Sequence, residues 1–156
     1  MTDLITQGLT HHIGVSNFPP IQLEALLNNT AHPPAAHQID DLNPISPQTD
    51  WLAWHEAAGI HVTASAPLAS SKNSPHYNSA ANLLLETSVL AKIARERHCS
   101  SPAQVALAWA LRRGTSVVPS SGHREGISEH FAALECELPE EDALKVDALG
   151  LVSQGA

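Results

Sequence analysis

Four short runs with strand character recur along this chain, and each is followed by a segment whose apolar residues have helical spacing. The predicted strands are residues 13–16, 36–39, 60–64 and 116–118. This alternation is typical of βα units, which place their strands in one parallel sheet. Eight such units close a barrel of about 250 residues. The 156 residues therefore predict an α/β fold, a partial (β/α)8 TIM barrel of about four βα units plus a terminal helix.

Helix start and stop signals stand between these strands. The clearest start is at Ser101, which can cap a helix while Pro102 suits its first position and Gln104 completes a capping box. Gly59 is expected just past a helix end, where a left-handed backbone is needed, and Gly150 past the end of the last helix. The predicted helices cover residues 20–29, a stretch around 52–58, 87–97, 102–113, 127–133 and 140–149.

Charge and composition limit the partners of this chain. A net charge of −8, with eight Lys and Arg in all, offers no basic face for a nucleic acid. No apolar run approaches the ~20 residues that span a bilayer, and residues 1–7 lack the apolar core of a signal peptide. We therefore expect a single cytoplasmic domain, residues 1–156, with no nucleic-acid or membrane partner.

The spacing of cysteines and histidines favours ordinary roles. Cys99 and Cys136 alone do not make up a disulfide framework, which fits a reducing cytoplasm. At the end of a predicted helix, the dipole would raise the pKa of the Cys99 thiol rather than activate it. The ten histidines lack the spacing that metal sites show, so surface or capping positions are expected and no metal.

Five short motifs follow one another in a fixed order. They are GVSNF at 14–18, QID at 38–40, GIHVTASAPL at 59–68, SPAQVALAW at 101–109 and VPSS at 118–121. In this order they resemble the C-terminal half of the aldo-keto reductase barrel, over residues 8 to about 150. The resemblance implies an NAD(P)(H)-linked oxidoreductase that acts on carbonyl or alcohol substrates, with NADP or NAD as cofactor.

Polar side chains at strand ends are the candidate binding residues, because ligands of such barrels gather there. Ser16, Asn17 and Gln38 can hydrogen-bond a planar amide, and the resemblance implies that they hold the nicotinamide carboxamide. On the residues alone, the Ser-Asn pair could equally cap the following helix. Leu68 and Ser70 belong either to the loop over the pyrophosphate or to an ordinary turn. The other implied cofactor-binding residues are Ser65, Ser120, Ser121, Glu129 and His130.

Several of these positions depart from the family pattern. Ser65 stands where an aromatic ring stacks on the nicotinamide, and Ser120 where a lysine follows the strand proline. Gly126 replaces the arginine at the 2′-phosphate, and His130 the asparagine near the adenine. Charge-assisted hydrogen bonds contribute about 1.5–3 kcal/mol each. We therefore expect weakened 2′-phosphate contacts and little preference for NADP.

No catalytic residue is implied for this chain. In the family, the Asp, Tyr, Lys and His set precedes the GVSNF strand, which here begins at Gly14. The one tyrosine, Tyr77, lies in a predicted long loop over 67–82, of which residues 71–82 are either a flap over the ligand or a plain connection. We expect an enzyme that is weak or inactive alone. The alternatives are a non-catalytic truncated pseudoenzyme or interaction module, and a partial reading frame.

An open half-barrel leaves its first and last strands unpaired. This predicts self-association, or pairing with a complementing half-barrel, besides a small carbonyl substrate. A dimer or poor solubility is expected for the isolated chain.

Overall fold

The computed structural model describes residues 1–69 and 84–153, with the side chains of 151–153 excepted. Ser70, Tyr77 and the predicted flap over 71–82 lie outside the described residues. None of the described helices is both long enough and apolar enough to cross a membrane. The elements in chain order are α1 (Thr2–Thr6), β1 (Gly14–Ser16), α2 (Pro20–Asn29), β2 (Ala36–Asp40), α3 (Thr49–Ala57), β3 (His61–Ser65), α5 (Ser88–Glu96), α6 (Pro102–Arg112), β4 (Ser116–Val118), α7 (Arg124–Phe131), η1 (Ala132–Glu135) and α8 (Glu140–Ser153).

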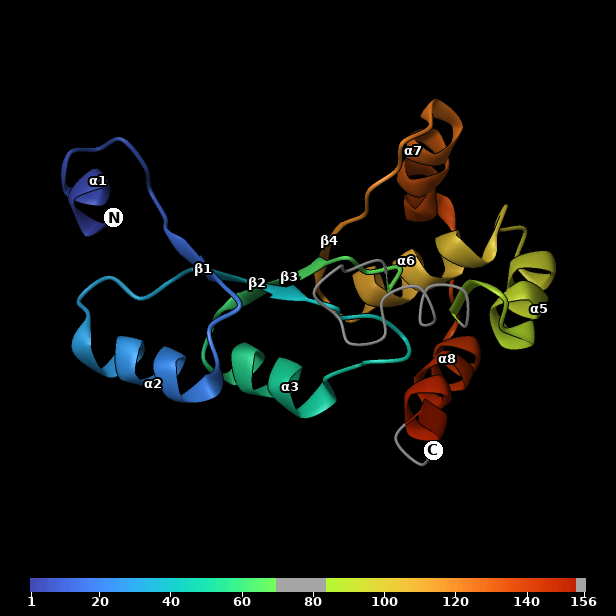
Figure 1. The fold of residues 1–156 in the computed structure, drawn as a ribbon, viewed down its shortest axis with the longest axis horizontal. Helices are drawn as coiled ribbons and strands as arrows, with labels where there is room; N and C mark the ends of the chain where they lie inside the picture. Colours follow the sequence, from blue (N-terminus) through green and yellow to red (C-terminus); the bar gives the residue numbers. More distant parts are fainter. Residues whose placement is uncertain (70–83, 154–156) are drawn as a thin grey trace.

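The four strands form one parallel sheet in the order β1-β2-β3-β4. Each strand is joined to the next by helix, and β1 and β4 are the two edges of the sheet (Figure 1). This confirms the predicted partial (β/α)8 barrel, with every predicted strand present within one residue of its expected ends.

One face of the sheet is covered by helices and packs a core. Figure 1 shows α2 and α3 on this side of the sheet. Ile39, Val62 and Ala64 point into it and are buried together with Leu42. A second core gathers around α6, where residues 104–110 are all buried and Trp109 is fully enclosed. The alternation of strand side chains leaves the opposite face of the sheet with Ser16, Gln38 and their neighbours.

The local signals at the helix ends are mostly confirmed. The hydroxyl of Ser101 accepts a hydrogen bond from the Gln104 N–H at 3.3 Å, and the Gln104 side chain accepts one from the Ser100 N–H at 2.7 Å. Gly59 follows α3 with φ of +70°. The prediction for Gly150 is wrong, because α8 continues through it to Ser153. There the glycine allows close approach, since a Cβ would lie 2.5 Å from Pro47 Cγ.

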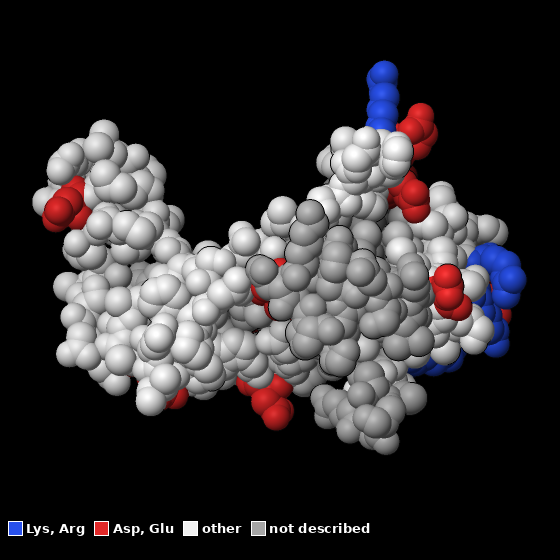
Figure 2. Space-filling model, in the orientation of Figure 1, with Lys and Arg blue, Asp and Glu red and all other residues white. Residues whose placement is uncertain are grey.

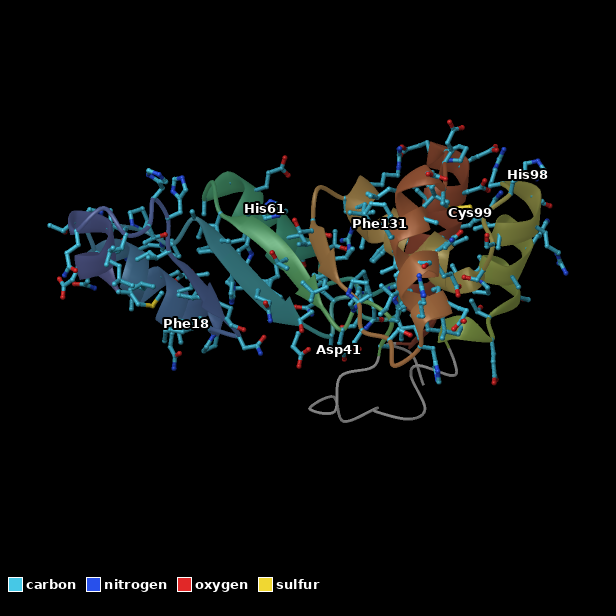
Figure 3. The ribbon with its side chains drawn as sticks, turned by 90° about the horizontal axis from the view of Figure 1, so that it is seen from above. Phe18, Asp41, His61, His98, Cys99 and Phe131 are labelled. Carbon is cyan, nitrogen blue, oxygen red and sulfur yellow. A yellow bond between two sulfur atoms is a disulfide. The ribbon has the colours of Figure 1, made fainter. Side chains whose placement is uncertain are left out.

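The C-terminal helices are joined by contacts between residues far apart in sequence. Asp142 on α8 is fully buried and accepts hydrogen bonds from Arg97 Nε at 2.5 Å and Lys145 Nζ at 2.6 Å. These bonds, led by that from Lys145, lower the pKa of the Asp142 carboxyl. Contrary to the expectation from the sequence, Cys99 and Cys136 form a disulfide across 37 residues (Figure 3). Two cysteines need only meet in space to pair, and their spacing gave no sign of it.

Candidate functional site

A row of small polar side chains crosses the open face of the sheet. Ser16 on β1 lies in register with Gln38 on β2, and Gln38 with Thr63 on β3. Asp40 and Ser65 form the next row toward the carboxyl ends of the strands. Ser16 and Gln38 are exposed, whereas Thr63, Asp40 and Ser65 are half-buried. Neighbouring strands lie about 4.8 Å apart, so one planar ligand can reach the side chains of both Ser16 and Gln38.

The molecule is hollowed above this face. Helices α1 and α7 rise on the side of the sheet opposite α2 and α3 (Figure 1), and the outline is concave between them (Figure 2). Figure 3 shows Asp41 at the end of the sheet where the strands finish, and His61 at the opposite end. His61 Nε2 lies 2.7 Å from Ser116 Oγ, so these two side chains hydrogen-bond to each other across β3 and β4.

Asn17 occupies a special position directly after β1. Its φ is +55°, in the left-handed region, which asparagine tolerates better than most residues. The Asn17 N–H donates to the carbonyl of Gln38 at 3.0 Å, and its side-chain oxygen accepts from the Asp40 N–H at 2.9 Å. The Asn17 side chain therefore connects β1 to β2 instead of capping α2, whose N-cap is Pro19 with no side-chain bond.

A buried chain of hydrogen bonds supports this turn from the helix side of the sheet. The Phe18 N–H donates to His37 Nε2 at 3.1 Å, which leaves the His37 proton on Nδ1. His37 Nδ1 then donates to His55 Nε2 at 2.7 Å, and His55 Nδ1 to the carbonyl of Trp51 at 2.7 Å. Both histidines are neutral and at most 1% exposed. Each carries its proton on Nδ1, because each Nε2 already accepts a hydrogen bond.

Burial is the main influence on the acidity of this histidine pair. Loss of hydration, with a smaller contribution from His55, lowers the pKa of His37 from 6.5 to about 4. Burial also lowers the pKa of His55, against the opposing effect of its bond to the Trp51 carbonyl. This histidine pair was not predicted from the sequence, because no spacing links a strand residue to one 18 positions later on a helix.

The other predicted site residues that the structure describes lie at and beyond the ends of β3 and β4. Leu68 is buried in the core around α6, and Ser65 ends β3. Ser120 is exposed just beyond β4. Ser121 and His130 line a common hollow of about 430 Å³ beside β4. The structure thus brings Ser16, Asn17, Gln38 and Ser65 to one end of the open face, and Ser121 and His130 to the β4 margin.

Glu129 is engaged in packing α7 against α6. Its carboxylate accepts a hydrogen bond from the Ser101 hydroxyl, and its backbone carbonyl accepts one from Gln104 Nε2 at 2.9 Å. The same two residues that begin α6 therefore also hold α7. This second use of Ser101 and Gln104 was not predicted from the capping box.

The surroundings of the strand ends differ in charge from one side to the other. A hollow of about 730 Å³ opens between the starts of α2 and α3. Within the described residues it is lined by Asp40 and Asp50 but by neither Lys nor Arg. At the opposite margin, Arg124 begins α7 and is exposed. Gly126 lies so close to Ser121 that a Cβ would come 2.3 Å from the serine hydroxyl.

Parallel βα units in sequential order, with polar strand ends on the open face, define half of a (β/α)8 barrel. The sequence model of the Aldo/keto reductase family matches residues 1–150. The chain therefore belongs to the aldo/keto reductase family. It is 35% identical over 97% of its length to an uncharacterized oxidoreductase of Schizosaccharomyces pombe, and 37% identical over 92% to methylglyoxal reductase DkgB of Escherichia coli O157:H7.

Solved structures give the same assignment. The aldose reductase of Giardia lamblia superposes with a TM-score of 0.84 at 32% identity over 97% of this chain. The aldose reductase of Schistosoma japonicum superposes with a TM-score of 0.82 at 30% identity. The chain spans 45–48% of those two proteins, and 46% and 49% of the two curated relatives named above. It thus spans about half the length of the proteins that it matches.

Proposed function

We propose that this chain belongs to an NAD(P)(H)-linked oxidoreductase of carbonyl or alcohol substrates, in which Ser16, Asn17 and Gln38 hold the nicotinamide carboxamide. The observation that carries the proposal is that Ser16 on β1 and Gln38 on β2 are register partners and are both exposed on the open face. Membership of the aldo/keto reductase family supports it, as does the presence of a methylglyoxal reductase among the relatives.

The three side chains offer complementary hydrogen bonds to an amide. Gln38 supplies a donor and an acceptor in one plane, and the Ser16 hydroxyl supplies either. The Asn17 oxygen is taken by the Asp40 N–H, so Asn17 contributes its amide N–H groups. A bound nicotinamide dinucleotide supplies the hydride for carbonyl reduction. The residues of this chain orient the nicotinamide ring. They are held in place by strand pairing and by the hydrogen bond from the Phe18 N–H to His37 Nε2.

We propose further that the site discriminates little between NADPH and NADH. Ser120 and Gly126 cannot form ion pairs with a 2′-phosphate, and the exposed Arg124 is the nearest cation in sequence. A side chain at position 126 would first require Ser121 to rotate away. The two nucleotides should therefore bind with dissociation constants within about tenfold of each other, the effect of a single lost charge-assisted bond.

The test is thermal unfolding of the chain with NADPH and with NADH. A nucleotide at 100 times its dissociation constant stabilises the folded state by about 2.7 kcal/mol, so the unfolding temperature should rise with either one. Gln38→Ala should weaken binding about tenfold. Gln22→Ala on α2 is the matched control, because it removes the same amide from an exposed helix position. A wild-type transition that neither nucleotide moves would favour the non-catalytic module instead.

A further inference from the structure

The β4 margin of the sheet exposes an apolar stripe. Ile127, Phe131 and Leu134 on α7 and η1 are 60%, 76% and 65% exposed, at the i, i+4, i+7 spacing of one helix face. Val118 at the end of β4 is 53% exposed. The three stripe residues line the hollow of about 430 Å³ beside β4, and Figure 3 shows Phe131 near that strand.

The opposite margin, around β1, is almost free of charge. Residues 4–39 contain a single charged side chain, Glu24, although 15% of the whole chain is charged. Figure 2 shows the corresponding part of the surface largely without Lys, Arg, Asp or Glu. Leu4 and Leu9 there are 42% and 71% exposed. Depletion of charge with retained apolar side chains distinguishes the centre of a protein interface from ordinary surface.

The exposed apolar residues are concentrated at these two margins. Ten large hydrophobic residues are exposed in the described chain, and seven of them lie in residues 1–9 or 118–134. The other three are Ile21, Leu85 and Leu144. Such a distribution marks an interaction surface, whereas scattered single residues would not. Within the described residues, β1 and β4 are the edge strands of a fully parallel sheet, one at each margin.

We propose that the two margins bind each other in a twofold dimer, in which β4 of each copy pairs with β1 of the other. A twofold axis along the barrel axis keeps all strands parallel. The dimer then has two seams, at each of which β4 of one copy meets β1 of the other, and they are identical, as closed symmetric dimers require. The described strands of two copies number eight, as in a closed (β/α)8 barrel, so that no edge of the combined sheet is left unpaired. The partner is therefore a second copy of this chain. This inference depends on the sheet margins and not on the proposed nucleotide site.

The oligomeric state tests the proposal. Sedimentation of the wild-type chain over a concentration series should give a dimer of two 16.6 kDa chains. Phe131→Glu should weaken dimerisation at least about 30-fold, the effect of a buried aromatic hot spot. Leu144→Glu is the matched control, because Leu144 on α8 is 58% exposed and lies away from both margins. It should leave the dimer intact, and circular dichroism should show that both variants remain folded.

A second substitution tests the β1 margin, which faces β4 of the other copy in the proposed dimer. Leu9→Glu should also give monomers, because Leu9 lies in the segment that leads into β1 and is 71% exposed. A mixture of the Phe131→Glu and Leu9→Glu chains contains one seam without substitution, so it should re-form heterodimers at concentrations where each variant alone is monomeric. A wild-type monomer, an open-ended assembly, or a mixture that stays monomeric at every soluble concentration would overturn the proposed arrangement.

Discussion

At the scale of single residues, the buried histidine pair is the feature that joins fold and site. His37 shares its strand with Gln38 but points to the opposite face, where it accepts the Phe18 N–H directly after Asn17. The partner of His37 is His55, which is held by Trp51 one helical turn earlier. The position of the Ser16–Asn17 turn therefore depends on two neutral imidazoles beneath the sheet.

Acidification should destabilise the chain through this pair. The pKa of His37 is about 4 in the folded chain, below the ordinary 6.5, so the unfolded chain binds more protons between these values. The contribution of His37 to the stability of the folded chain is complete above about pH 6.5 and is lost as the pH falls toward 4. Between pH 7 and pH 5 the free energy of unfolding should drop by about 2 kcal/mol, which denaturant titrations can measure.

Substitution should separate this effect from general acid sensitivity. His37→Gln should flatten the dependence of stability on pH, since glutamine still offers an acceptor to Phe18 but no group that titrates. His32→Gln, at an exposed position, is the control and should leave the slope unchanged. An unchanged slope in His37→Gln would contradict the assignment.

At the scale of elements, the C-terminal helices are held by long-range ties more than by local signals. Helix α5 meets α8 through Arg97 and Asp142, and Trp109 on α6 donates its indole N–H to Asp147 on α8 at 2.8 Å. The disulfide between Cys99 and Cys136 joins the start of α6 to the approach of α8. These ties fix the helices that pack on the β3–β4 side of the sheet.

Reduction of the disulfide should loosen this group of helices. Opening a crosslink that spans 37 residues should lower the free energy of unfolding by about 2–4 kcal/mol. Dithiothreitol should therefore lower the denaturation midpoint of the wild-type chain. A double variant, Cys99→Ser with Cys136→Ser, should be less stable and should not respond to the reductant. Two thiols that titrate freely in the non-reduced, unfolded chain would contradict the bond.

At the scale of the whole molecule, the chain is an open half of a barrel. Its four strands expose a polar face between two apolar margins, and it spans about half the length of its relatives. The open face carries Ser16, Gln38 and Ser65, which suit binding of a planar polar group. None of these three side chains is a strong acid–base group.

The isolated chain should therefore reduce carbonyl compounds slowly or not at all. A positioned general acid contributes about 10²–10⁴-fold in rate. The described residues of the open face include neither a tyrosine nor a lysine. Consumption of NADPH with methylglyoxal or a simple aldehyde should stay near the background of buffer. Robust turnover by the purified 156-residue chain, lost in Gln38→Ala but kept in Gln22→Ala, would show that this expectation is wrong.

The local part of the fold was predictable from the sequence. The four strands, the start of α6 at Ser101 and Pro102, and the left-handed Gly59 depend on neighbouring residues, so short patterns specify them. The strand-end position of Ser16 and Gln38 follows from the same patterns, because parallel strands end at one edge. The short helix α1 was missed, since five residues give too little periodicity to recognise.

What the sequence by itself determined is therefore the order of the βα units, the family and the residues at the strand ends. Only the tertiary structure decided that His37 meets His55, that Cys99 pairs with Cys136, and that α8 runs through Gly150 past Pro47. Each of these depends on residues 18 to about 100 positions apart that share no local pattern. Packing brings such residues together, and the surface left uncovered, with its two apolar margins, is likewise a property of the assembled sheet.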